Sequence, residues 1–91
     1  MNAENYEAIN VLNVSKGFNR EGLQHQITPY RFHRKDGSTN HISQIRHFHQ
    51  QRSGRRHQFH YHVLTRDGLY CRLLFDMHTL TWRLVEVKKS E

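Results

Sequence analysis

The sequence predicts an all-β fold, a small antiparallel meander of five to six strands that is either open or closed into a small barrel. Apolar and polar residues alternate with a period of two over much of the chain, whereas helical periodicity is hard to find. Glycine-containing turn sequences recur between the alternating runs. The chain has 91 residues, the length of one domain with one compact core.

The first element is a polar tail over residues 1–8, which we expect to be flexible. A short strand follows over Ile9–Val14, so we expect a single β domain over residues 9–91. The segment Ser15–Gly22 contains two glycines and is typical of a loop. The rest of the chain is predicted to form consecutive hairpins.

The turn Arg66-Asp67-Gly68 suits a three-residue hairpin loop, a type I turn followed by a glycine in the left-handed conformation. This register places Val63 opposite Cys71 and Phe59 opposite Phe75. A slip of one residue would put charges on the apolar face, which favours the three-residue loop.

Two further turns continue the same apolar face. Lys35-Asp36-Gly37 has the chemistry of a second three-residue loop, and the last turn lies near residues 76–80. The predicted pairs are Tyr30 with Ile42 in the first hairpin, and Phe75 with Trp82 and Leu73 with Leu84 in the last.

The middle turn, Ser53-Gly54-Arg55-Arg56, offers glycine at the first central position of a two-residue type II′ turn. A looser loop over Gln51–Arg56 is the competing interpretation, and it would scatter the histidines. The type II′ register predicts outward pairs of His49 with His60 and His47 with His62, and inward pairs of Phe48 with Tyr61 and Gln50 with Phe59.

The positive charge is concentrated in the middle of the chain. Residues 22–66 contain eight arginines and lysines, eight of the nine histidines and one acidic residue, Asp36. Eight bases and one acid give this segment a formal charge of +7, compared with +6 for the whole chain. A cationic block interleaved with aromatic residues favours a polyanionic partner.

Nucleic-acid binding is the predicted function. The planar guanidinium of arginine suits bidentate contact with phosphate, and such binding to DNA or RNA is driven mostly by charge. The same surface also fits an acidic protein partner, and a solvated cationic surface that only keeps the protein soluble is the simplest alternative. The predicted contact residues are Arg31, Arg34, Lys35, Arg46, Arg52, Arg55 and Arg56.

The histidines support a different hypothesis, a metal-binding protein. Four imidazoles on one strand face suit zinc or another transition metal. However, these segments contain no carboxylate to support the ligands, and the neighbouring arginines repel cations, so no cofactor is the main expectation. Histidines also gain charge below a pKa of about 6.5, which predicts polyanion affinity that rises in mild acid. The candidate ligands are His47, His49, His60 and His62.

No catalytic constellation is present, and we expect no enzymatic activity. Paired carboxylates, a phosphate-binding glycine loop and a serine-centred triad are all missing. Cys71 is predicted to face Val63 inside the core, where a thiol is inert. Asp36 and Asp67 suit their turns, and Asp76 at a strand end is predicted to do the same. The aromatic motifs of RRM proteins, the GXXG loop of KH domains and zinc-finger spacings are also missing.

One cysteine allows no internal disulfide and favours a reducing compartment such as the cytoplasm. We expect no signal peptide and no membrane span.

An alternative function is a protein-interaction or homo-oligomeric assembly module, such as a homodimer joined through an edge strand or the histidine face. The predicted aromatic core comprises Phe32, Phe48, Phe59, Tyr61, Phe75 and Trp82.

Overall fold

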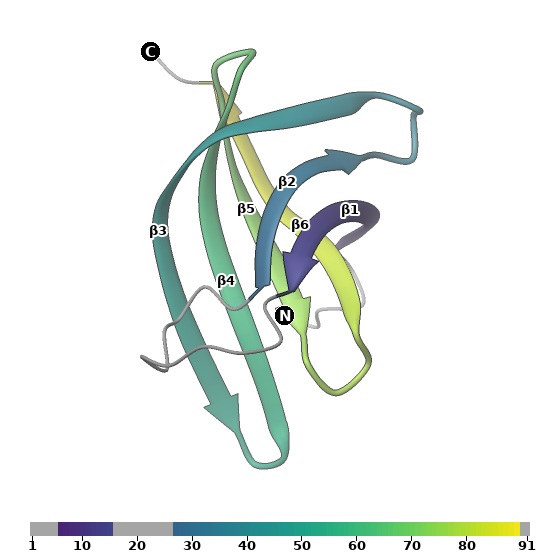
Figure 1. The fold of residues 1–91 in the computed structure, drawn as a ribbon. Helices are drawn as coiled ribbons and strands as arrows, with labels where there is room; N and C mark the ends of the chain where they lie inside the picture. The colour runs from purple at the N-terminus through teal and green to yellow at the C-terminus, as the bar shows by residue number, and fades with distance from the viewer. Residues whose placement is uncertain (1–5, 16–26, 90–91) are drawn as a thin grey trace.

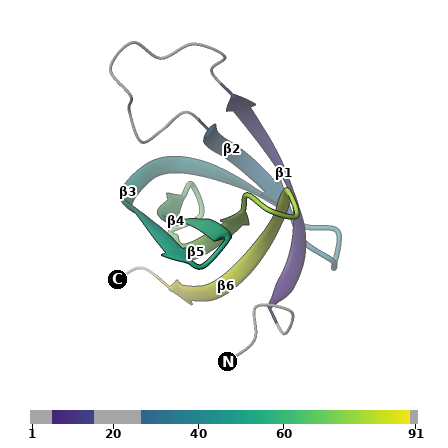
Figure 2. The same ribbon diagram turned by 90° about the horizontal axis from the view of Figure 1, so that it is seen from below.

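A computed structural model describes residues 6–15 and 27–89, which form six antiparallel strands in a closed barrel (Figure 1). Each strand pairs with the next in the sequence, and β1 closes the barrel by pairing with β6. Seen from one end, the strands surround a common interior (Figure 2). The predicted meander is confirmed, with six strands and in its closed form. The strands are β1 (Glu7–Ser15), β2 (Ile27–His33), β3 (Thr39–Ser53), β4 (Arg56–Thr65), β5 (Leu69–Asp76) and β6 (Thr81–Lys89).

The β3–β4 hairpin has the predicted tight turn. Ser53 pairs with Arg56, so the loop has two residues, and Gly54 at its first position has a φ of 59°. Arg55 at the second position does not have a positive φ, which makes this the type II′ geometry that glycine permits. The predicted cross-strand pairs are all present: His49 with His60, His47 with His62, Phe48 with Tyr61 and Gln50 with Phe59.

The two three-residue loops are also as predicted. Gly37 and Gly68 have φ values of 88° and 84°, and each glycine N–H donates to the carbonyl three residues earlier. The β2–β3 ladder has the predicted register from His33–Thr39 to Arg31–His41, and it ends before Tyr30 and Ile42. The pairs confirmed in the later hairpins are Val63 with Cys71, Phe59 with Phe75, Phe75 with Trp82 and Leu73 with Leu84.

Strand β3 contains two irregularities that a period of two does not predict. Its register with β4 shifts after Ile42 and again after Ile45. Each bulge adds one residue, so Ile42, Ile45 and Phe48 all pack against the core although they are three positions apart. Strict alternation from Phe48 would point Arg46 into the barrel, but the second bulge leaves it exposed.

The turn between β5 and β6 is organised by Asp76. Its Oδ1 atom accepts hydrogen bonds from the backbone N–H groups of His78 and Thr79, at 2.8 and 3.3 Å. Its carbonyl accepts a third from the N–H of Leu80, at 2.8 Å. Asp76 therefore serves its turn as predicted. Leu80 has a φ of 56°, and its side chain is 70% exposed.

Replacing Leu80 with glycine is expected to stabilise the protein by about 0.5–1 kcal/mol. A residue with a Cβ pays roughly 1–2 kcal/mol in the left-handed conformation, and the greater freedom of glycine in the unfolded chain offsets part of the gain. Urea denaturation measures the change. Met77→Gly in the same turn is the control, because Met77 does not have a positive φ and should lose stability. A lower midpoint for Leu80→Gly would contradict the strain argument.

Strand β1 begins at Glu7, two residues before the predicted start at Ile9. Residues 7–9 pair with Trp82–Leu84 of β6 and close the barrel, so the tail predicted over residues 1–8 ends inside this strand. Residues 1–5 lie outside the described residues. So does the predicted loop from residue 16 onward, while Ser15 is the last residue of β1.

The barrel interior is filled by aromatic and aliphatic side chains. Tyr61 is fully buried, and its hydroxyl donates to the carbonyl of Ile27 at 2.6 Å, so its polar end is satisfied. Phe48 is the exception among the predicted core aromatics, because it is only half-buried against Phe59 and Tyr61. The predicted core residues that are buried are Phe32, Phe59, Tyr61, Phe75 and Trp82.

Candidate nucleic-acid interface

The predicted basic residues are divided between the two ends of the barrel. Consecutive turns of a meander lie at alternate ends, and Figure 1 shows the β2–β3 and β3–β4 turns far apart. Arg52, Arg55 and Arg56 lie at the β3–β4 turn, whereas Arg34 and Lys35 lie at the β2–β3 turn. These residues therefore form two separate groups rather than one surface.

The β3–β4 hairpin forms a projecting ribbon. Strand β5 ends at Asp76, which pairs with Gln58, so beyond Gln58 the hairpin has only two of the described strands (Figure 1). Arg52 and Arg55 are exposed at its tip. Arg56 places its Nη2 atom 3.3 Å from Oδ2 of Asp76, with 54% of its side chain exposed and 8% of the aspartate side chain. The tip therefore presents two exposed guanidinium groups and a third that also holds the ribbon to the β5 end.

The arginine at the opposite end has a structural partner. Arg34 donates from Nη2 to Oε1 of Glu7 at 2.7 Å and from Nε to Oε2 at 3.1 Å. The hydrogen bonds from Arg34 lower the pKa of Glu7, and those to Glu7 raise the pKa of Arg34. The N–H of Lys35 also donates to Glu7, at 3.2 Å, so this turn is fastened to β1. Lys35 and Arg31 are exposed, but the charge of Arg34 is compensated.

The four predicted histidines gather on one outer face of β3 and β4, and we call His47, His49, His60 and His62 the histidine cluster. The His49 and His60 rings stack with centroids 4.4 Å apart and planes 7° apart. The His47 and His62 rings meet edge to face at 5.2 Å. The shared face that the type II′ register predicted is therefore present.

Burial and neighbouring bases keep part of this cluster uncharged. Burial first, and then His49 and Arg72, lowers the pKa of His60 to about 4. Burial also lowers the pKa of His62. Within the described residues, His60 Nδ1 and His62 Nε2 are buried without a hydrogen-bond partner. His60 therefore does not supply the charge predicted for the block in mild acid, and the lowered pKa of His62 works against that charge as well.

The cluster does not have the geometry of a metal site. No group of three or more His, Cys, Asp or Glu side chains in residues 6–15 and 27–89 is arranged to hold an ion. The stacked rings of His49 and His60 lie in nearly parallel planes, so their nitrogens do not converge on one point. The metal hypothesis thus gains no support from the face that suggested it.

The stability of the fold is expected to fall as the pH is lowered from about 6.5 towards 4. The unfolded chain binds protons at His60 and His62 as the pH falls through about 6.5. In the folded chain both pKa values are lowered, that of His60 to about 4, so protonation favours the unfolded chain. The loss should total on the order of 1–2 kcal/mol, because the groups keep some contact with solvent. Urea midpoints at several pH values measure it.

A His60→Gln variant provides the control for this pH dependence, because glutamine does not titrate. It should make the profile above pH 4.5 shallower, because of these two imidazoles only His62 still titrates in the variant. Glu7 and Asp76 have lowered pKa values, so their contributions are lost only at lower pH, in both proteins. An equally steep profile in the variant would exclude His60 as its source.

Sequence reasoning missed the part that β5 contributes to this face. Arg72 pairs with His62, a neighbour that the register of the third turn already implied. Arg46 donates from Nη1 to the Tyr70 hydroxyl at 3.2 Å, and its guanidinium lies 5.7 Å from the centre of the Tyr70 ring. The bulge before His47 makes this contact possible, and no sequence signal marks that bulge.

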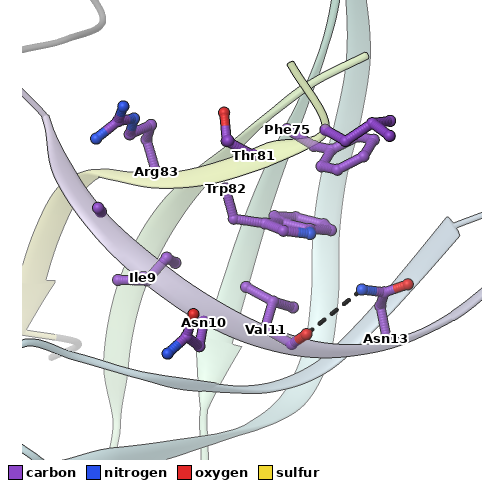
Figure 3. A pocket seen from close by; sticks show the side chains of 10 residues that line it. Ile9, Asn10, Val11, Asn13, Phe75, Thr81, Trp82 and Arg83 are labelled. Carbon is purple, nitrogen blue, oxygen red and sulfur yellow. Dashed lines mark hydrogen bonds between the residues drawn. The ribbon is translucent and has the colours of Figure 1, made fainter. Parts of the chain in front are cut away.

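A pocket of about 490 Å³ opens where β1 and β6 separate beyond Ile9 (Figure 3). Trp82 of β6 lies in one wall. In the other wall, Asn13 donates from its side chain to the carbonyl of Val11 on the same strand, β1, at 3.4 Å. Arg83 is its charged residue, and no carboxylate, histidine or cysteine is among its described lining residues. The pocket therefore offers amide and apolar contacts but no acid–base pair.

The one cysteine lies where the sequence predicted. Cys71 pairs with Val63 and is 4% exposed in the core, and burial raises the pKa of its thiol to about 11. A thiol with this pKa stays protonated near neutral pH and is a poor nucleophile.

Comparison with protein-family models, curated proteins and solved structures finds no match for this chain. No helix long and apolar enough to cross a membrane is found in the part of the chain that the structure describes.

Proposed function

We propose that the protein is a non-enzymatic nucleic-acid-binding module that uses the outer face of the β3–β4 hairpin and its tip. The binding is driven by phosphate contacts and has little sequence preference. Because the single cysteine is a buried free thiol, a reducing compartment such as the cytoplasm suits this role.

One observation carries the proposal: among the residues that the structure describes, the hairpin presents cations without nearby unpaired carboxylates. Residues 37–66 contain no aspartate or glutamate. The acids on the adjacent strands already have basic partners, since Asp76 pairs with Arg56 and Glu86 with Lys88 at 3.2 Å. The potential of the face therefore stays positive, and positive potential is what attracts a phosphate backbone.

The dimensions of the hairpin suit such a partner. A two-stranded ribbon fits the major groove of B-DNA, and the β3–β4 ribbon ends in Arg52 and Arg55. From Arg55 to His62 the face is about 23 Å long at about 3.3 Å per residue. One strand of B-DNA presents about seven phosphates over this length. Exposed imidazole and guanidinium planes also let unpaired bases stack, so single strands are equally suitable ligands.

Fluorescence anisotropy of labelled single- and double-stranded oligonucleotides, over a series of salt concentrations, tests the proposal. Micromolar or tighter binding that weakens steeply with salt is expected, and the slope gives the number of phosphate contacts. Absence of binding at low salt would contradict it. An acidic peptide of equal charge, bound as tightly as the oligonucleotides, would point to a protein partner instead.

Homodimerisation is the second candidate function, and it rests on a different surface. Leu12, Val14 and Tyr30 are 50%, 48% and 51% exposed on the adjacent strands β1 and β2. Two copies joined there would bury apolar surface and keep their cationic hairpins apart. Light scattering at high salt tests it, because an apolar interface survives salt whereas phosphate binding does not. A monomer at all concentrations would exclude it.

A further inference from the structure

We propose that a pocket of about 290 Å³ beside the histidine cluster binds one phosphate group, with Arg72 and His62 as its central ligands. It lies on the outer side of β4, β5 and β6, and Tyr70, Glu86 and Lys88 also line it. The inference rests on the proposed function for the source of the phosphate, which is the backbone of a bound nucleic acid.

Arg72 is the central cation of this pocket. Its Nε atom is buried and has no hydrogen-bond partner within the described residues. A guanidinium is charged at every relevant pH and only donates, so a buried N–H without an acceptor is costly. Glu86 is its cross-strand neighbour, yet the carboxylate of Glu86 forms its ion pair with Lys88. The Nε–H of Arg72 therefore lacks an acceptor, and an oxyanion would supply one.

His62 adds a second nitrogen in the same situation. It is paired with Arg72 across the β4–β5 ladder, and its Nε2 atom is also buried without a partner among the described residues. In the tautomer that carries the proton on Nε2, it donates to the same oxyanion as Arg72. A cationic ligand would be repelled by Arg72 and Lys88, and an anionic one adds an acceptor that the single carboxylate of Glu86, paired with Lys88, does not give to Arg72 Nε.

Tyr70 links this pocket to the proposed nucleic-acid face. Its hydroxyl accepts a hydrogen bond from Arg46, so its own proton remains available to another acceptor. Arg46, Arg72 and Lys88 together outweigh Glu86, which leaves the pocket and its rim positively charged. A nucleic-acid backbone that runs along the hairpin from its tip to Arg46 therefore reaches the pocket. One of its phosphates enters the pocket.

Nuclear magnetic resonance of the full ¹⁵N-labelled chain tests the site. The side-chain Nε–H signal of Arg72 and the ring signals of His62 are followed during titration with inorganic phosphate and, separately, with a short oligonucleotide. Both probes are expected to move both signals, saturably, and the oligonucleotide at a concentration at least tenfold lower than phosphate. If neither probe moves them, the site is excluded.

Variants separate this site from general charge effects. Arg72→Gln should abolish the phosphate response of His62, and Arg72→Lys should weaken it while keeping the charge. Arg83→Gln is the matched control, because Arg83 is on the neighbouring strand but does not line this pocket. Thermal unfolding of each variant confirms that it is folded, and the lysine variant still tests the site if the glutamine variant does not fold.

The outcomes distinguish the two proposals. If the oligonucleotide binds and perturbs only the hairpin tip, the phosphate pocket is wrong and nucleic-acid binding stands. If inorganic phosphate fills the pocket but no oligonucleotide binds, nucleic-acid binding is wrong. The ligand of the pocket is then a free phosphate, and its assignment to a nucleic-acid backbone is wrong as well.

Discussion

Replacing Trp82 with alanine is expected to destabilise the protein by about 3–5 kcal/mol, which is most of the stability of a domain of this size. Trp82 is 8% exposed, and its ring centroid lies 4.8 Å from that of Phe75 and 5.4 Å from that of Tyr61. It also pairs with Ile9, where β6 meets β1, so its loss affects both the core and the barrel closure. Urea denaturation at neutral pH measures the change.

Val87→Ala is the matched control for this prediction. It lies on the same strand as Trp82, but it is 37% exposed and outside the buried cluster, so it should cost about 1 kcal/mol or less. If the tryptophan variant is folded with nearly normal stability at room temperature, Trp82 does not organise the core. Equal losses for the two variants would mean that β6, rather than this side chain, is the sensitive element.

The registers were predictable because the turns have specific chemistry. Gly54 fixes a two-residue loop, and Gly37 and Gly68 fix three-residue loops, since each requires a positive φ that other residues avoid. Once a turn fixes the register, the cross-strand pairs follow by counting until a bulge shifts them. The turn residues and the alternation of the strands therefore explain why the histidine cluster lies on one face and why Cys71 is buried.

The bulges were not predictable in the same way. They arise where β3 bends around the barrel, and a period of two gives no sign of a single extra residue. The start of β1 was missed for a related reason. Glu7 is polar, as the residues of a flexible tail usually are. In the structure it accepts hydrogen bonds from Arg34, which is 27 positions away in the sequence. A contact between residues so far apart depends on the closed barrel.

The candidate site was predicted in part. The tip arginines Arg52 and Arg55 are exposed as expected, whereas Arg34 has a structural partner that net charge could not reveal. Charge counting also treats all histidines alike. Burial sets His60 apart, because a pKa of about 4 requires a packed environment that only the folded barrel provides.

The double variant Arg52→Ala/Arg55→Ala is expected to weaken oligonucleotide binding about 30-fold at 0.15 M salt. Each phosphate contact on B-DNA contributes about 0.9 to the slope of log K against log salt, so losing two lowers the slope by about 1.8. At that salt concentration the same relation gives a loss of about fivefold per contact. Anisotropy over a salt series measures both quantities. Both residues are exposed, so stability should not change.

Lys35→Ala/Arg66→Ala is the charge-matched control, since it removes two exposed positive charges from the opposite end of the barrel. Because exposed charges are largely screened beyond about 8 Å at physiological salt, this variant should lose no more than about threefold in affinity, with an unchanged slope. Equal losses in the two variants would mean that net charge alone attracts the ligand. A loss confined to the control would move the interface to the β2–β3 end, where Lys35 was also predicted to bind.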